Sequence, residues 1–473
     1  MFGLETDIFL LLAFCLFAAC AFEFVNGFHD TANAVATVIY TNSLKPNTAV
    51  VWSGFCNFLG VFFGGIAVAM GILNLLPTEL LIDQNVYHSI AMVLALLFSA
   101  IVWNLGTWYF GLPSSSSHTL IGSILGVGLA FTFMPENTSG TGVNTAKATE
   151  IFISLFTSPL FGFSLAIVLM FILRRSLDKP LRNLVFSEPK KNQPPPAWIR
   201  GILITTCTLV SFFHGSNDGQ KGVGLIMLIL IGITPTYFAL DNSKNPLLMR
   251  ENLTQIETIV NRVNPTLLSA RDRAELVVTK REIASLKTQI SKPLVDNTLP
   301  EGERLNARRS VLLISRNIKD LLNSRTANLS LADANVLEKQ IGEEQGLRRF
   351  TDYAPDWVIL MISLSLGLGT MVGWKRIVVT IGEKIGKQHL TYAQGASAEL
   401  VAASTIGVSS WLGLPVSTTH VLSSGIAGSM VASKGIKNLQ GGTVRNIAIA
   451  WVLTLPVTMI LSGTLYTFFR WIF

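Results

Sequence analysis

The chain has 473 residues, of which 50% are hydrophobic and only 14% are charged, and its mean hydropathy is +0.49. Soluble domains carry about 25% charged residues, so this composition excludes an ordinary soluble enzyme or binding domain and indicates a protein embedded in a lipid bilayer. The formal net charge is +7, but many basic residues stand in short loops between apolar segments, where they orient a membrane protein, so no nucleic-acid partner is implied.

Ten apolar stretches are predicted to span the membrane as helices, because a spanning helix needs about 20 mainly apolar residues. They fall five in each half of the chain: 8–40, 49–70, 89–110, 115–134 and 150–173, then 200–238, 355–374, 393–412, 416–433 and 446–470. A polar motif interrupts the first stretch of each half, so we expect breaks near Gly27 and Gly215. The predicted fold class is an all-α integral membrane protein with broken helices and re-entrant segments.

The loop charges orient these spans. Segment 174–200 holds seven Lys/Arg against two Asp/Glu, and it is short enough for this excess to place it in the cytoplasm. An odd number of crossings in each half turns the second half upside down relative to the first, so the halves are predicted to be inverted repeats. The first repeat is 1–173, the linker is 174–200, and the second repeat is 201–240 with 353–473.

One long polar segment interrupts the second repeat. Residues 241–352 contain 18 of the 36 Lys/Arg and 15 of the 29 Asp/Glu. The two repeated motifs described below are offset by 188 and 302 residues, and the difference of 114 is close to the 112 residues of this segment. It is therefore predicted to be an insertion, and its spaced apolar residues favour amphipathic helices.

The first repeated motif places acidic residues inside apolar stretches. His29-Asp30-Thr31-Ala32-Asn33 recurs as Asn217-Asp218-Gly219-Gln220-Lys221. A carboxylate at membrane depth costs about 2.5–3.5 kcal/mol, so it is a functional candidate by default. Asp30 is expected to cap a helix that starts near Thr31 and whose positive end attracts an anion. The alternative is that both aspartates are only buried helix caps.

The second repeated motif is a turn rich in hydroxyl groups. Gly111-Leu112-Pro113 followed by Ser114–Ser117 and His118 recurs as Gly413-Leu414-Pro415 followed by Val416, Ser417–Thr419 and His420. The proline ends the preceding helix and the glycine permits the turn. The hydroxyls can donate to the oxygens of a phosphate-like anion and can also cap the next helix. For either copy considered alone, the alternative is a turn that binds no ligand.

Together these residues resemble the inorganic phosphate transporter (PiT) family. Gly27-Phe28-His29-Asp30-Thr31-Ala32-Asn33-Ala34 and Gly215-Ser216-Asn217-Asp218 are similar to that family's duplicated signature, and 413–420 is similar to its second signature. The resemblance covers 1–240 and 353–473 and is greatest to bacterial low-affinity transporters. It implies a multi-pass protein of the bacterial inner membrane that takes up phosphate, largely as a neutral metal–phosphate complex, with protons. An animal branch that couples to sodium has a glutamate where this chain has Asn57, which disfavours sodium, although Glu399 matches that branch.

The hypothesis is therefore secondary symport of inorganic phosphate. The candidate substrate-binding residues are Thr31, Asn33, Ser115, Ser116, Ser117, Lys221, Ser417, Thr418 and Thr419. The candidates for the coupling ion or metal are Asp30, Asp218, Glu23 and Glu399. The candidate proton-relay residues are His29, His118, His214 and His420. No bound cofactor is expected beyond a coupling cation (proton or sodium) and a divalent metal carried with phosphate, and a homodimer is left open.

The residues leave three alternatives to phosphate symport open. Another oxyanion, such as sulfate or arsenate, would use the same donors, and a gated channel would use the same pore lining. An intramembrane hydrolase would need Ser116 or Ser117 to meet His118 and an aspartate in space. Duplication of every part in both halves disfavours the hydrolase, and no enzymatic activity is predicted.

Overall fold

The computed structural model describes residues 4–73, 75–76, 85–135, 143–190, 193–294, 298–324 and 326–473. Within these ranges the chain is helical. Its β-structure is limited to an isolated β-bridge between Gly386 and Leu439 and a further isolated bridge residue at position 298. The chain divides into two compact units, one built from Thr6–Ile229 with Pro355–Phe473 and a smaller one built mainly from Leu230–Ala354. We call them the membrane unit and the insertion unit and describe each by itself.

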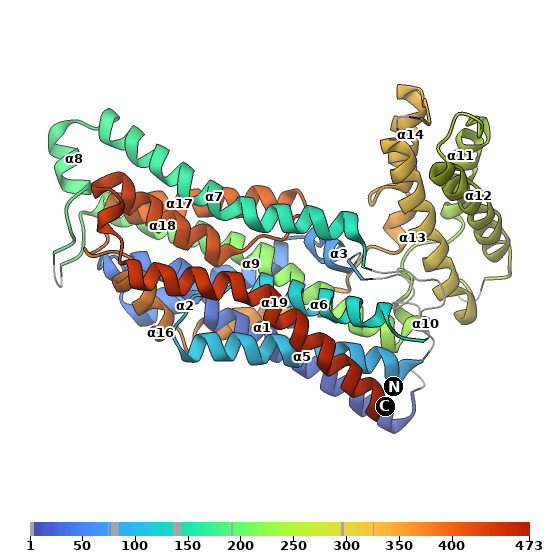
Figure 1. Cartoon of the computed structure of the whole chain (residues 1–473), viewed down its shortest axis with the longest axis horizontal. Coiled ribbons are helices and arrows are strands. Elements are labelled where there is room, and N and C mark those ends of the chain that lie inside the picture. Colours follow the sequence, from blue (N-terminus) through green and yellow to red (C-terminus); the bar gives the residue numbers. More distant parts are fainter. Residues whose placement is uncertain are drawn as a thin grey trace. The chain divides into compact units, whose positions relative to one another are not determined.

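The membrane unit is built from helices, most of which are labelled in Figure 1. Its first-half helices are α1 (Thr6–Tyr40), α2 (Pro46–Phe63), α3 (Ala67–Leu73), α5 (Val86–Tyr109), α6 (Ser116–Thr132), α7 (Thr145–Ser176) and α8 (Lys179–Val185). Its second-half helices are α9 (Ala197–Ile233), α15 (Asp356–Thr370), α16 (Lys375–Val379), η2 (Thr380–Lys384), α17 (Tyr392–Trp411), α18 (Thr418–Lys434), η3 (Ile436–Asn438) and α19 (Gly441–Ile472).

Five of the described helices are long and apolar enough to cross a membrane, namely α1, α5, α7, α9 and α19, and two bent pairs raise the number to seven. The pairs are α2 with α3, bent by 71°, and α15 with α16 and η2, bent by 56°. Helices α6 and α18 have 17 residues each, which is short of the roughly 20 needed to span. The predicted count of ten spanning helices is therefore not confirmed, and the division into repeats and the cytoplasmic side of 174–200 stay predictions.

The expected breaks at Gly27 and Gly215 are wrong. Both α1 and α9 run through these glycines without interruption. A side chain at Gly27 would meet the backbone of α15, with an added Cβ only 2.8 Å from the Thr370 nitrogen, and one at Gly215 would meet the Asn57 backbone of α2. The glycines are there because two helices touch, and the breaks lie in the paired helices named above.

Each half of the chain packs its helices against the other half. Helix α6 packs against α19, α7 against α18, and α1 against α15. Gly122 and Gly126 of α6 face the backbone of α19, and an added Cβ at Gly122 would lie 3.0 Å from the Leu455 carbonyl oxygen. Close contact between small residues is the usual way in which membrane helices associate. The two halves are therefore interlocked within one unit.

The insertion unit is a bundle of amphipathic helices with its own core. Its helices are α10 (Pro235–Phe238), α11 (Leu248–Arg262), α12 (Ala270–Ile290), α13 (Glu301–Asn323), α14 (Leu331–Ile341) and η1 (Leu347–Phe350). Leu253, Ile256, Ile283 and Ile314 are fully buried in this core. A soluble-type core explains why this segment is much more polar than the rest of the chain.

A buried arginine holds the two ends of the insertion unit together. Arg308 of α13 donates to the carbonyl oxygens of Ala239 at 3.0 Å and Thr351 at 2.9 Å. Burial lowers the pKa of the Arg308 guanidinium and raises the pKa of the Tyr353 hydroxyl to about 12. Asp241 N–H also donates to the Phe350 carbonyl oxygen at 2.8 Å. The chain therefore leaves the insertion unit beside the point where it enters.

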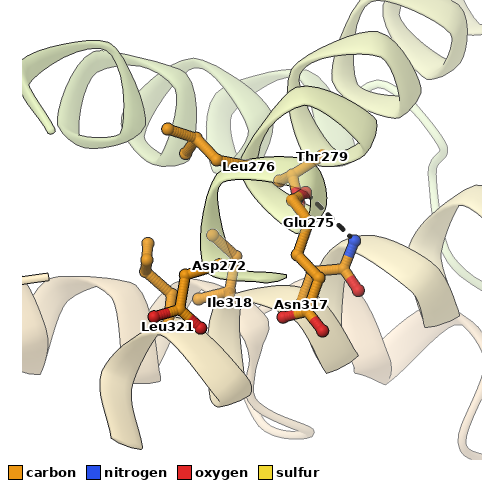
Figure 2. Close-up of a pocket in the computed structure, with 7 residues that line it drawn as sticks. All are labelled: Asp272, Glu275, Leu276, Thr279, Asn317, Ile318 and Leu321. Atoms are coloured by element: carbon orange, nitrogen blue, oxygen red, sulfur yellow. Dashed lines mark hydrogen bonds between the residues drawn. The ribbon is translucent and has the colours of Figure 1, made fainter. Parts of the chain in front are cut away.

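A small cavity lies between α12 and α13 (Figure 2). It is lined by Asp272, Glu275, Leu276, Thr279, Asn317, Ile318 and Leu321. Asn317 donates to the Glu275 carbonyl oxygen at its edge at 3.4 Å. The space of about 10 Å³ is that of one water molecule, so this cavity is too small for a substrate.

Candidate functional site

The membrane unit brings Asp30 of α1 and Asp218 of α9 together. These two carboxylates and the His214 imidazole each offer one ligand atom, and the three atoms lie within 4.8 Å of one another. Asp30 is 2% exposed and Asp218 is fully buried. Two carboxylates at this distance repel unless cations, protons or donors stand between them. The neighbouring side chains therefore decide what this cluster can do.

Asp30 is surrounded by hydrogen-bond donors from three helices. Its Oδ1 accepts from Thr419 Oγ1 at 2.5 Å and from Asn33 Nδ2 at 3.2 Å, and its Oδ2 accepts from Ser116 Oγ at 2.9 Å. The Ser116 hydroxyl also lies 3.2 Å from Asp218 Oδ2. Ser116 belongs to the first half and Thr419 to the second, so both hydroxyl-rich motifs reach the same carboxylate.

Asp218 is paired with the only lysine of its motif. Lys221 Nζ lies 2.7 Å from Asp218 Oδ1, and it also donates to Ser117 Oγ and, at 3.2 Å, to the Val416 carbonyl oxygen. Lys221 is 2% exposed. An ammonium has three N–H groups, and these three partners use them all. In this conformation Lys221 neutralises Asp218 and keeps no donor for an anion.

Two of the four candidate relay histidines contact the carboxylates. His29 Nδ1 lies 3.4 Å from Asp30 Oδ1, and His214 Nε2 lies 3.6 Å from Asp30 Oδ2. The other ring nitrogen of each is held by a residue that the sequence did not single out as a site residue: Thr107 at 3.3 Å for His29 and Asn57 at 2.8 Å for His214. Both are polar residues inside apolar spans, which was the signal available in the sequence.

The other two histidines form a separate pair. The rings of His118 and His420 lie 4.4 Å apart, and His420 stacks on Trp451 at 3.9 Å. His118 Nδ1 lies 2.8 Å from Ser115 Oγ. Ser116 and Ser117 instead donate to the aspartates and to the Val416 carbonyl, so the Ser–His–Asp relay of a hydrolase is not assembled here.

The hydroxyl-rich turns have the geometry that their sequence predicts. Gly111 and Gly413 have φ angles of +65° and +68°, a region that other residues rarely adopt. Ser115 caps α6 and Ser417 caps α18, each accepting the backbone N–H three residues later at 3.1 Å. Two helix N-termini therefore begin beside the aspartates, where free N–H groups and helix dipoles favour negative charge.

Thr31 and Thr418 are two of the candidate substrate-binding residues that do not donate to Asp30. The Thr31 hydroxyl lies 2.6 Å from the Gly27 carbonyl oxygen and 2.8 Å from that of Thr370, so it joins α1 to α15. Thr418 is the first residue of α18 and is 2% exposed. Asp30 itself lies inside a continuous helix, so the expectation that it caps a helix start near Thr31 is also wrong.

The two buried glutamates accept hydrogen bonds from residues outside the aspartate cluster, although Glu23 packs against Gly222, next to Lys221 in the chain. Glu23 Oε2 accepts from Asn26 at 3.1 Å, and Glu399 Oε2 accepts from Thr206 at 2.5 Å. The second oxygen of each carboxyl group is buried without a hydrogen-bond partner among the described residues. A buried carboxyl oxygen in this state is suited to carry a proton or meet a cation.

Comparison with known proteins identifies relatives over nearly the whole length. The family model described as "Phosphate transporter family" matches residues 26–462. The chain is 42% identical to the low-affinity inorganic phosphate transporter PitB of Escherichia coli, over 98% of this chain and 97% of that protein. It is 41% identical to PitA of the same organism, with the same coverage. The probable low-affinity inorganic phosphate transporter of Bacillus subtilis is 28% identical over 99% of this chain and 100% of that protein.

A solved structure shares the fold. It is described as "The sodium-dependent phosphate transporter", it covers 98% of this chain and 100% of its own, and its TM-score is 0.56 at 20% sequence identity. The relatives are transporters, so the function is not enzymatic. The matched family and the apolar helices together make this a multi-pass membrane protein, consistent with a bacterial inner membrane.

Proposed function

Because the chain belongs to the phosphate transporter family, we propose that it carries inorganic phosphate across the membrane by secondary symport with protons, as phosphate or as a metal–phosphate complex. The observation that carries this proposal is the cluster of Asp30, Asp218 and His214 with hydroxyl donors from both halves of the chain. Both halves must contribute to one site if alternating access is to expose it first on one side and then on the other.

The phosphate is held, in this proposal, by neutral donors rather than by a charged side chain. Ser116, Ser117 and Thr419 stand at the first turns of α6 and α18. In this conformation their hydroxyls donate to Asp30 and to the Val416 carbonyl oxygen. When a cation neutralises Asp30 and the helices open, the hydroxyls can turn, with the free N–H groups of the two helix starts, toward the oxygens of a tetrahedral anion. Asn33 lies between Asp30 and Thr419 and orients both.

The cation is held by the aspartates. Asp30, Asp218 and His214 provide oxygen and nitrogen ligands at distances that fit a divalent metal carried with phosphate, and Asp30 with His29 and His214 can accept a proton instead. Glu23 and Glu399 are secondary proton-binding candidates. Since the cluster is closed to water in this conformation, uptake requires the helices around it to open.

The decisive experiment is phosphate uptake into proteoliposomes with proton, sodium and divalent-metal gradients varied one at a time. We expect a proton gradient to drive uptake, a divalent metal to increase it and sodium to have no effect. Excess unlabelled sulfate should not compete, and saturable accumulation against a gradient would exclude a channel.

The aspartates are tested in the same vesicles. Asp30→Asn and Asp218→Asn should each reduce uptake to about 1% or less, because a buried charge partner worth about 3 kcal/mol is lost. Glu150→Gln is the control, since Glu150 is a half-exposed carboxylate paired with Lys147 on α7. Wild-type uptake by both aspartate variants would refute the site.

A further inference from the structure

The buried ammonium of Lys221 lies among three oxygens of different kinds. They are the Asp218 carboxylate at 2.7 Å, the Val416 carbonyl at 3.2 Å and the Ser117 hydroxyl. Val416 lies between α17 and α18, where the backbone is not helical. Hard metal cations take oxygen ligands of these types, and unwound carbonyls at a repeat interface are a usual source of them in transporters. The side chain therefore occupies the kind of oxygen cage that suits a monovalent cation.

A matching arrangement with a neutral side chain surrounds Asp30. The offset of 188 residues that relates Asp30 to Asp218 also relates Asn33 to Lys221, and the offset of 302 relates Ser117 to Thr419. Asn33 Nδ2 lies 3.2 Å from Asp30 Oδ1 and 3.0 Å from Thr419 Oγ1. Each aspartate thus meets the side chain three residues later in its own half and a hydroxyl of the opposite half, but only Asp218 has a permanent positive charge beside it.

Unused acceptor oxygens distinguish the two positions further. Asn33 Oδ1 is buried without a hydrogen-bond partner among the described residues, so it remains available to a cation near Asp30. Near Asp218 the three N–H groups of Lys221 already engage the oxygens of Asp218, Ser117 and Val416. Glu23 also lies on this side, because a Cβ added at Gly222 would be 2.6 Å from its carboxyl carbon.

We propose that Lys221 is a tethered cation that fills a monovalent-ion position at Asp218 Oδ1, so that no exchangeable ion binds there, whereas the position shared by the Oδ2 atoms of Asp30 and Asp218 with His214 stays open to the transported cation. This inference rests on the proposed symport and deepens it, because it makes one residue a determinant of which ion is used. Removing the ammonium while keeping the carboxylate should open the position to a free monovalent ion.

The test compares wild type, Lys221→Asn and the double variant Lys221→Asn/Asp218→Asn. Asparagine is the residue found at the matching position of the first half, and the double variant removes the carboxylate together with the ammonium. Each purified protein is heated in detergent with 100 mM sodium chloride or choline chloride, and unfolding is followed by tryptophan fluorescence. This readout needs no phosphate, so it is independent of the proposed function.

We expect Lys221→Asn to melt about 4 °C higher in sodium than in choline, as a ligand that binds only the folded state requires. Wild type and the double variant should show no difference between the two salts. In proteoliposomes, phosphate uptake by Lys221→Asn should rise about tenfold when sodium replaces choline, while wild-type uptake should not change.

Either of two results would overturn the inference. One is a folded Lys221→Asn protein that sodium does not stabilise, and the other is sodium stabilisation of wild type that disappears in Asp218→Asn. If Lys221→Asn is not recovered folded in either salt, the melting temperatures of wild type and Asp218→Asn in sodium and in choline decide whether the inference stands. Failure of phosphate uptake by wild type would instead refute the proposed function and leave the melting result standing.

Discussion

At the scale of single residues, the cluster depends on one hydroxyl group that lies between the two carboxylates. Ser116 lies within hydrogen-bond distance of both Asp30 and Asp218, and Thr419 and Asn33 complete the set around Asp30. A neutral donor between two buried carboxylates reduces their repulsion without fixing a charge there. Such a site can release its cation and its anion, which a transporter must do in every cycle.

Ser116→Ala should therefore weaken the site without unfolding the protein. We expect the KM for phosphate to rise about tenfold, because a hydrogen bond to a charged group contributes about 1.5–3 kcal/mol. Ser365→Ala is the matched control, since the Ser365 hydroxyl donates to the Met361 carbonyl oxygen of its own helix at 2.9 Å and otherwise contacts Cys20, not the aspartates. An unchanged KM in Ser116→Ala, or an equal rise in the control, would contradict this assignment.

At the scale of helices, glycines set how closely the two halves approach. Gly27, Gly126 and Gly215 all lie where a neighbouring helix leaves no room for a side chain. The sequence pattern of glycine beside a polar motif equally suits a helix break, which is why the prediction of breaks in the two long helices failed. The contact that decides between the two comes from residues hundreds of positions away.

Gly126→Ala should destabilise the packing of α6 against α19. An added Cβ at this position would overlap the Met459 carbonyl and the Ser462 hydroxyl, and overpacking of this kind costs about 1–3 kcal/mol. Gly106→Ala in α5 is the control, because nothing lies within 4 Å of its added Cβ. There the better helix propensity of alanine should be neutral or stabilising, by up to about 1 kcal/mol.

The comparison is made by thermal unfolding in detergent. A melting temperature for Gly126→Ala equal to that of Gly106→Ala would show that α6 and α19 can separate without loss, contrary to the packing described.

At the scale of the whole molecule, the insertion unit has its own core and closes on itself. Asp241 and Phe350 are joined by a backbone hydrogen bond, and Arg308 ties Ala239 to Thr351. Insertions whose ends adjoin can be shortened with little strain on the rest of the chain. The residues proposed to bind substrate and ion all belong to the membrane unit.

Replacing residues 242–349 by a four-residue Gly-Ser linker should thus leave phosphate transport in place. We expect uptake within about twofold of the full-length protein at equal membrane abundance, because the linker only has to span a hydrogen-bonded pair. Adding Asp30→Asn to the shortened chain should abolish uptake and so show that the transport measured is its own. Complete loss of uptake by a stably inserted shortened chain would assign the insertion a role in the cycle.

The count of ten spans and the bounds of the insertion stay predictions, whereas the all-helical fold, the two duplicated motifs and the glycine turns before α6 and α18 could be predicted from the amino-acid sequence. These depend on composition and on local backbone preference, which act within a few residues. Contacts between distant segments were needed to show that α1 and α9 stay continuous and that His29 and His214 join the aspartates while His118 and His420 form a separate pair. The same contacts show that Asp218, Ser117 and Val416 occupy all three N–H groups of Lys221. Those outcomes depend on which side chains from distant segments share a buried space, and in a low-dielectric interior each polar group must find its partner there.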